Sequence, residues 1–354
     1  MDRKTLLLLL ISVLILLGML YLVGINQVIS ALKMANLYLI ALAIGVQVAT
    51  YFLYTLRWQI LNKIAGMDVS IKKLLPMVLV GLAVNNITPS GRGGGEPVRA
   101  YLLYKDNENY TFDETFAAVV ADRALDTFPF VVLAAITIAS MALFFNFDAW
   151  LLVVMVLAVI AILIILFALI YMCINPGFGS KVEGWIVGLV RRFYKKNSES
   201  LENSIHDAIV GFQHTMRVVM SDKKGLAYTL TLSFIIWISE IVRVYFVFLA
   251  FGANVNLIVI GEVFIVACLV GMIPLLPGGL GAIDGLMILL YSAAGVSASV
   301  SAAATVIERL ISFWMATILG MVILPHYGSS VLDKISFSGS PEEIEEVVES
   351  ESDD

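Results

Sequence analysis

Six uninterrupted apolar stretches dominate this chain, at roughly residues 5–25, 36–56, 114–141, 149–173, 225–251 and 298–324. Each is close to the about 20 residues that an α-helix needs to cross the hydrocarbon core of a bilayer. Charged residues make up 14% of the chain, whereas about a quarter of the residues in a soluble domain are charged. The sequence therefore predicts an all-α polytopic membrane protein. The first stretch is predicted to be a retained span, because no small-residue cleavage site follows it.

Two further apolar segments, residues 74–104 and 257–295, are interrupted near the middle by glycine and proline. The interruptions contain Pro89, Gly91, Gly93, Gly94 and Gly95 in the first segment, and Pro277, Gly278, Gly279 and Gly281 in the second. Each segment is long enough for two half-helices joined by an unwound tip, where glycine permits positive φ and close backbone approach. We predict two re-entrant helical hairpins with these residues at their tips.

Positive charge predicts the orientation of the chain, because cytoplasmic loops accumulate Lys and Arg. Cations precede the first span, and Arg57, Lys63, Lys72 and Lys73 are assigned to the loop after the second. Further cations crowd residues 175–224, whereas the loops on the other side contain almost none. The N-terminus and the C-terminal tail are therefore predicted to be cytoplasmic, in the cell membrane. The first hairpin must then open to the cytoplasm and the second to the outside.

An internal repeat supports this arrangement. Aligning Pro89 with Pro277 places Glu96 on Asp284, and the following helix carries Asp122 and Arg123 in one half but Glu308 and Arg309 in the other. We predict two inverted-topology repeats, residues 1–145 and 146–332, each built as span, span, hairpin and span. Inverted repeats with interrupted helices are typical of transporters. The alternative is that glycine and proline only assist helix packing.

Two segments lie outside the predicted spans. Residues 175–224 carry apolar side chains at helical spacing with polar ones between them, which predicts an amphipathic helix on the cytoplasmic surface. Residues 333–354 are strongly acidic and predict a disordered, solvated tail.

The apolar segments contain five arginines and no lysine: Arg92, Arg99, Arg123, Arg243 and Arg309. An ionisable group at bilayer depth costs roughly 2.5 to 3.5 kcal/mol on insertion scales, and it usually faces a cavity or a partner. The planar fork of arginine matches phosphate or carboxylate in two-point contact. Seven carboxylates oppose these arginines: Glu96, Asp122, Asp126, Glu240, Glu262, Asp284 and Glu308.

Spacing along the helices predicts how some of these charges pair. Glu96 with Arg99, and Glu240 with Arg243, are three residues apart and lie on one helix face. Asp122 and Arg123 are adjacent and point apart, as are their counterparts in the second half, so each is expected to pair across helices.

We predict that Arg92, Arg123 and Arg309 bind a phosphate, while Asp122, Asp284 and Glu308 orient them and exchange a proton. The complete predicted substrate-binding set is Arg92, Glu96, Arg99, Asp122, Arg123, Asp126, Asp284, Glu308 and Arg309. The alternative is that these charges are structural ion pairs that hold the hairpins. Asp122 and Asp126 also have the spacing to share a divalent cation, but we predict no metal, cofactor or catalytic constellation.

The order of the motifs resembles that of a known family. The motifs are Thr88-Pro89, the run Gly93-Gly94-Gly95-Glu96-Pro97-Val98-Arg99-Ala100, Asp122-Arg123, the run Pro277-Gly278-Gly279-Leu280-Gly281-Ala282-Ile283-Asp284-Gly285, and Glu308-Arg309. Over residues 5–325 the chain resembles the flippase-like family that includes the transmembrane region of lysylphosphatidylglycerol synthases. The family often has Glu where this chain has Asp284.

The resemblance implies that the protein moves a lipid with a charged or glycosylated headgroup between leaflets. The soluble aminoacyl-transferase domain is missing from this sequence, so a separate lipid-synthesising enzyme is an expected partner; nucleic acid is not, and the oligomeric state stays open. We therefore predict a lipid flippase or scramblase rather than an enzyme. The alternatives are a small-anion channel or exchanger, and an integral membrane lipid transferase or a partner subunit of one.

Overall fold

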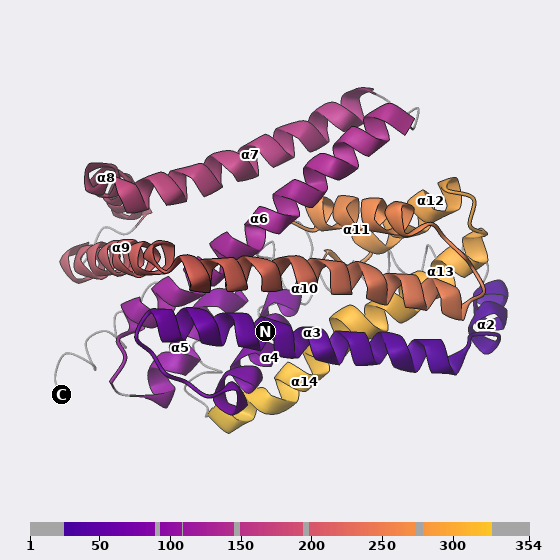
Figure 1. The fold of residues 1–354 in the computed structure, drawn as a ribbon, viewed down its shortest axis with the longest axis horizontal. Helices are drawn as coiled ribbons and strands as arrows, with labels where there is room; N and C mark the ends of the chain where they lie inside the picture. The colour runs from indigo at the N-terminus through magenta and orange to yellow at the C-terminus, as the bar shows by residue number, and fades with distance from the viewer. Residues whose placement is uncertain are drawn as a thin grey trace.

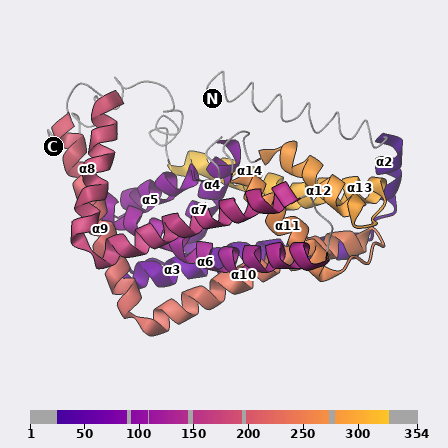
Figure 2. The same ribbon diagram turned by 90° about the horizontal axis from the view of Figure 1, so that it is seen from above.

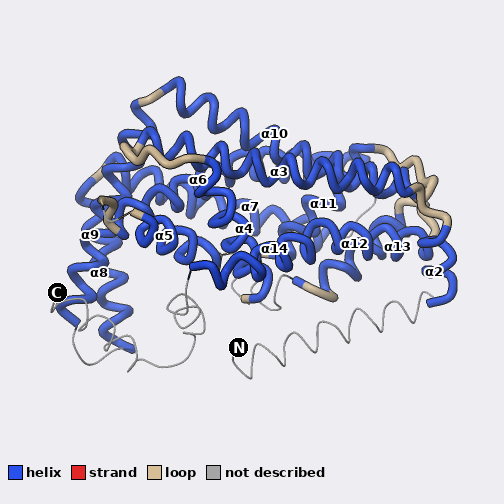
Figure 3. Tube along the Cα trace, turned by 90° about the horizontal axis from the view of Figure 1, so that it is seen from below, coloured by secondary structure: helices blue, strands red, loops and turns tan. Residues whose placement is uncertain are grey.

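The computed structural model describes residues 25–88, 93–107, 109–144, 149–193, 198–272 and 279–327, where all regular elements are helices (Figures 1 and 3). Five helices are long and apolar enough to cross a membrane: Leu37–Ile64, Phe112–Leu143, Val153–Met172, Lys223–Ala250 and Ala298–Tyr327. They correspond to five of the predicted spans. Residues 5–24 of the first predicted span lie outside the described residues, as does the tail at 333–354.

Helices α3 (Leu37–Ile64) and α10 (Lys223–Ala250) lie side by side along the length of the molecule (Figures 1 and 2). At one end the Asn36 N–H, just before α3, donates to the carbonyl of Ala250 at the end of α10 over 2.7 Å. At the other end Leu61 of α3 packs with Leu226 of α10. The two helices are therefore antiparallel.

The first interrupted segment forms two short helices, α4 (Ile71–Ile87) and α5 (Gly95–Asp106), which pack against each other. Lys73 Nζ lies 2.9 Å from Asp106 Oδ2, so the segment starts and finishes at the same end of the bundle. The helices cross where a Cβ on Gly95 would collide with the backbone of Gly81. Neither helix has the about 20 residues needed to cross a bilayer.

The second interrupted segment forms α11 (Leu257–Gly271) and α12 (Ala282–Ala293) in the same manner. Val255, before α11, and Val296, after α12, belong to one apolar cluster at the other end of the bundle. Gly279 and Gly281 precede α12 with φ of 65° and 80°, a region that favours glycine. Of the predicted tip residues, Pro89, Gly91, Pro277 and Gly278 lie outside the described residues.

The last span of each half carries an irregular feature: a proline inside a continuous helix in the first half and a π-helical turn in the second. Helix α6 (Phe112–Phe144) contains Pro129, which removes a backbone hydrogen bond. The final span consists of α13 (Ala298–Arg309), a π-helical turn (Leu310–Trp314, η2), α14 (Met315–Ile323) and a 3₁₀ turn (Leu324–Tyr327, η3). In both halves the feature follows closely after the acidic–arginine pair, and π-helical turns are frequent at functional sites.

The connection between the halves contains α7 (Ala149–Ile174), α8 (Pro176–Phe193) and α9 (Ser198–Ser221). Helices α8 and α9 run across one end of the bundle, and α2 (Ile25–Lys33) lies at the other (Figure 2). The prediction of one amphipathic surface helix is therefore refined to two helices. Phe212 and Met216 of α9 are buried against α6, and His206 Nδ1 lies 3.0 Å from Glu183 Oε1 of α8.

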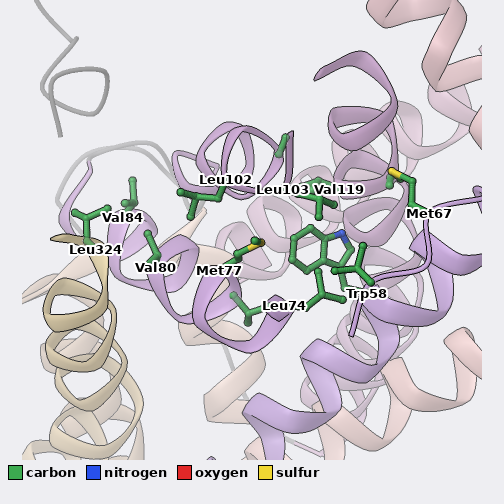
Figure 4. Close-up of a cluster of buried hydrophobic side chains, with 14 residues drawn as sticks. Trp58, Met67, Leu74, Met77, Val80, Val84, Leu102, Leu103, Val119 and Leu324 are labelled. Carbon is green, nitrogen blue, oxygen red and sulfur yellow. The ribbon is translucent and has the colours of Figure 1, made fainter. Parts of the chain in front are cut away.

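A buried apolar cluster fixes the first hairpin in the bundle (Figure 4). Its labelled members come from α3, the α3–α4 connection, α4, α5, α6 and η3: Trp58, Met67, Leu74, Met77, Val80, Val84, Leu102, Leu103, Val119 and Leu324. The ring of Trp58 also lies under the guanidinium of Arg99, whose carbon is 4.2 Å from the ring centroid. This contact joins the apolar core to the buried charges.

Candidate functional site

Arg57 is the centre of a buried ion cluster, although the sequence interpretation placed it in a cytoplasmic loop. That prediction is wrong because α3 continues to Ile64, beyond the predicted end of the span at residue 56. Arg57 is only 1% exposed. Its Nε donates to Asp122 Oδ1 over 2.7 Å, and its Nη1 donates to Asp126 Oδ1.

Two more arginines complete this first cluster, on α5 and α6. Both Nη atoms of Arg99 donate to Asp122 Oδ2 over 3.2 Å. Arg123 Nε donates to Glu96 Oε1 over 2.5 Å, and its Nη1 lies 3.7 Å from Asp126 Oδ2. The first cluster therefore comprises three arginines and three carboxylates: Arg57, Arg99, Arg123, Glu96, Asp122 and Asp126.

The second cluster lies on α10, α12 and α13. Arg243 is 1% exposed; its Nη2 donates to Glu308 Oε1 over 2.7 Å and its Nη1 to Glu240. Arg309 Nε donates to Asp284 Oδ1 over 2.5 Å. The other oxygen of Asp284 accepts from the N–H of Gly281 over 2.7 Å and so caps α12. The second cluster therefore comprises two arginines and three carboxylates: Arg243, Arg309, Glu240, Asp284 and Glu308.

The two clusters have the same plan. Arg57 and Asp122 are 65 residues apart, as are Arg243 and Glu308. Arg123 binds the acid at the start of α5, and Arg309 binds the acid at the start of α12. Four positions thus form equivalent pairs in both halves: Arg57 with Arg243, Glu96 with Asp284, Asp122 with Glu308, and Arg123 with Arg309.

The central arginines also reach across to each other's helix. Arg57 Nη1 donates to Ser233 Oγ of α10 over 2.9 Å, and Arg243 Nη1 donates to Gln47 Oε1 of α3. Gln47 and Ser233 hold equivalent positions, about three helical turns before Arg57 and Arg243. Such reciprocal contacts, in which i meets j and j meets i, are what a two-fold relation between two elements produces.

A cavity of about 170 Å³ lies between the clusters. All five arginines of the two clusters line it, together with Asp126, Glu240 and Glu308. Tyr51 and Tyr54 of α3, Trp237 of α10 and Phe264 of α11 contribute aromatic surface. The cavity thus combines guanidinium donors from both halves with an apolar wall, which suits a small anionic group carried on an apolar body.

The structure brings together most of the predicted substrate-binding residues. Arg99, Arg123, Asp126, Glu308 and Arg309 line the cavity, while Glu96, Asp122 and Asp284 lie behind it as partners of these arginines. Arg92 lies outside the described residues.

The ion pairs that the sequence predicted are confirmed in part. Pairing across helices is confirmed for both adjacent acid–arginine pairs, and pairing within a helix is confirmed for Glu240 with Arg243. Glu96, however, binds Arg123 rather than Arg99. Asp284 holds Arg309, and Asp122 holds Arg57 and Arg99. Glu308 binds Arg243 of α10.

Asp122 and Asp126, which have the spacing to share a divalent cation, bind an arginine in this structure. Both carboxylates accept hydrogen bonds from Arg57. Across the part of the chain that the structure describes, no group of three or more His, Cys, Asp or Glu side chains is placed to hold a metal ion.

Comparison with known proteins gives consistent matches over nearly the whole chain. The sequence model of a family described as the lysylphosphatidylglycerol synthase TM region matches residues 6–320. A UPF0104 membrane protein of Methanothermobacter thermautotrophicus is 48% identical over 335 residues, covering 95% of this chain and 99% of that protein. UPF0104 membrane proteins of Methanocaldococcus jannaschii (31% identity; 91% of this chain, 94% of that protein) and Pyrococcus horikoshii (29% identity; 91% and 96%) are also similar.

Proposed function

Because this chain belongs to the family of the lysylphosphatidylglycerol synthase TM region, we propose that it is a lipid flippase or scramblase. Its cargo is a lipid with an anionic, phosphate-bearing or glycosylated headgroup, which it moves between the leaflets of the cell membrane. The observation that carries this proposal is the cavity lined by five arginines from the two clusters. Five guanidinium groups in an apolar, membrane-length bundle are costly unless they serve a ligand or hold the structure.

The size of the cavity favours a headgroup over a whole lipid. Its volume is about 170 Å³, whereas pockets that enclose drug-sized ligands measure about 300–1,000 Å³. In the proposed mechanism the headgroup enters the cavity and exchanges its hydration for arginine hydrogen bonds. The acyl or prenyl chain stays in the surrounding lipid.

An inverted arrangement of the two halves would support movement of a lipid from one side of the membrane to the other. Helices α3 and α10 are antiparallel and exchange reciprocal contacts, so a two-fold axis relating them would be perpendicular to both helices. If they span the membrane, this axis lies in the membrane plane, which is the arrangement of an inverted-topology transporter. The two helical hairpins, α4–α5 and α11–α12, start from opposite ends of the bundle and would then be re-entrant from opposite sides.

The distribution of surface charge supports an orientation. Lysines occupy several helix ends: the last turns of α3 (Lys63) and α5 (Lys105) and the first turns of α4 (Lys72, Lys73) and α10 (Lys223, Lys224). These helix ends lie at the end of the bundle that carries α8 and α9 (Figure 2). At the opposite end of the bundle, among the described residues, Lys33 lies in the last turn of α2. The positive-inside rule assigns the α8–α9 end to the cytoplasm.

Reconstitution into vesicles tests the proposal. Full-length protein is incorporated into vesicles containing a lipid with a fluorescent label on its headgroup, and dithionite added outside bleaches the labelled lipid that reaches the outer leaflet. The wild type is expected to bleach well beyond the outer half of the label. Arg123→Ala and Arg309→Ala are expected to lose this activity while remaining folded in detergent.

A matched control distinguishes this proposal from its rivals. Lys72→Ala alters an exposed cation outside the clusters and is expected to behave as wild type. Wild-type vesicles that bleach only the outer-leaflet label contradict the proposal. Phosphate or chloride flux in those same vesicles would instead identify an anion channel or exchanger.

A further inference from the structure

Arg123 and Arg309 occupy equivalent positions but are neutralised differently. Arg123 lies between two carboxylates, Glu96 and Asp126. In the second half the position equivalent to Asp126 is Ser312, which also lines the cavity. Among the described residues Arg309 has one salt-bridge partner, Asp284. Because fewer carboxylates neutralise it, Arg309 keeps more capacity to bind an anion than Arg123 does.

The environment of Arg309 contains an unused donor. Its Nη2 atom is buried and has no hydrogen-bond partner among the described residues. A buried donor without a partner is costly, and more so when it is charged. The Arg309 side chain is 11% exposed, against 34% for Arg123. An anion at Arg309 would thus be better shielded from water than one at Arg123.

We propose that the cavity holds one phosphate oxyanion on its second-half side, bound by Arg309 and the hydroxyl of Ser312. This subsite rests on the proposed function, because it names the place where the headgroup would be held. Both side chains line the same cavity, and a serine hydroxyl can donate to an oxyanion. Nε of Arg309 stays on Asp284, which fixes the guanidinium while its outer edge meets the ligand.

The other acids of the second cluster are occupied by a different arginine. Glu308 and Glu240 both accept hydrogen bonds from Arg243, which also donates to Gln47. On the first-half side, Asp126 already engages Arg57 and lies near Arg123. An oxyanion there would face a carboxylate where the second half offers a hydroxyl, which explains why the subsite is assigned to Arg309.

Exchanging the one differing position tests this assignment. Ser312→Asp copies the first half and places a carboxylate beside Arg309, and Ser312→Asn has nearly the same size without the charge. The two probes are inorganic phosphate and dihexanoyl phosphatidylglycerol, titrated calorimetrically into purified full-length protein at constant ionic strength. Thermal unfolding of both variants establishes that they are folded.

We expect Ser312→Asp to weaken binding by at least about tenfold, as loss of a charged hydrogen bond does. Ser312→Asn should stay within about threefold, and Arg309→Ala should abolish binding. Tighter binding of the phospholipid than of phosphate identifies a lipid headgroup as the ligand, whereas equal affinities identify free phosphate; either supports the subsite. Wild-type affinity in folded Ser312→Asp, or no binding of either probe to the wild type, overturns it.

The vesicle assay separates this subsite from the proposed function. Wild-type lipid movement together with unaltered binding in Ser312→Asp would remove the subsite and leave the flippase proposal standing. Binding that depends on Ser312 in a protein that moves no lipid would leave the subsite and remove the flippase proposal.

Discussion

The first and second ion clusters have four equivalent positions and differ in what surrounds them. The shared positions join two spans to each other, through Arg57 and Asp122 in one half and Arg243 and Glu308 in the other. They also hold each hairpin, through Glu96 and Arg123 in the first half and Asp284 and Arg309 in the second. The additional members are unlike: Arg99 and Asp126 in the first cluster stand where Met287 and Ser312 stand in the second, and Glu240 stands opposite Tyr54. The shared positions thus connect the helices, and the positions that differ are those from which we propose different anion binding in the two halves.

Removing a shared central arginine is expected to have the largest effect. Arg57→Ala leaves Asp122 and Asp126 buried without their main partner, and breaking a buried ion pair in this way costs about 3–5 kcal/mol. Arg243→Ala should cost a similar amount because Glu240 and Glu308 lose theirs. Thermal unfolding in detergent measures both. A cost confined to one arginine would show that the two clusters are not equivalent supports.

The sequence allowed the membrane class and five of the spans to be predicted because the length of an apolar stretch is a local signal. The described helices match the five predicted spans within their range, and the equivalence of Glu96 with Asp284 reappears as equivalent ion pairs. Arg57 was missed because the second predicted span was ended at residue 56, just before this arginine. Its identical spacing to Asp122, as from Arg243 to Glu308, was the signal that would have placed it inside.

Partners across helices could not be predicted from spacing. Glu96 and Arg99 are three residues apart on one helix, yet Glu96 binds Arg123 and Arg99 binds Asp122. Arg99 turns toward Asp122 and stacks over Trp58, and both choices depend on how α5 packs on α3 and α6. Only the packed structure determines which acid lies within reach of each guanidinium.

The close crossing in the first hairpin provides the next test. Gly95→Ala would place a Cβ against the backbone of Gly81, and overpacking of this kind costs about 1–3 kcal/mol. Gly184→Ala is the matched control, because an added Cβ there meets no atom within 4 Å. Thermal unfolding should show a loss for Gly95→Ala alone. Equal stability of the two variants would contradict the observed α4–α5 contact.

A smaller effect is expected from the reciprocal contacts between α3 and α10. Gln47→Ala and Ser233→Ala each remove one acceptor from a buried arginine that keeps its carboxylates, at about 1–2 kcal/mol apiece. Because the two contacts lie about three helical turns apart, the losses should add in the double variant to within about 0.5 kcal/mol. Thr231→Ala, at an exposed position of α10, serves as the control. A loss of stability in only one of the two variants would contradict the expectation that the two contacts contribute equally.

The smallest change in stability is expected at Glu240, an acid with no counterpart in the first cluster. Glu240→Gln removes one negative charge from the cluster with more carboxylates than arginines, while its amide oxygen can still accept from Arg243. Arg243 also keeps Glu308, so we expect unfolding free energy to change by less than about 1 kcal/mol. Glu308→Gln alters the shared position and should cost more. Thermal unfolding of the two variants side by side decides the matter, because a larger loss at Glu240 would mean that the unshared acid, and not the shared one, holds the second cluster together.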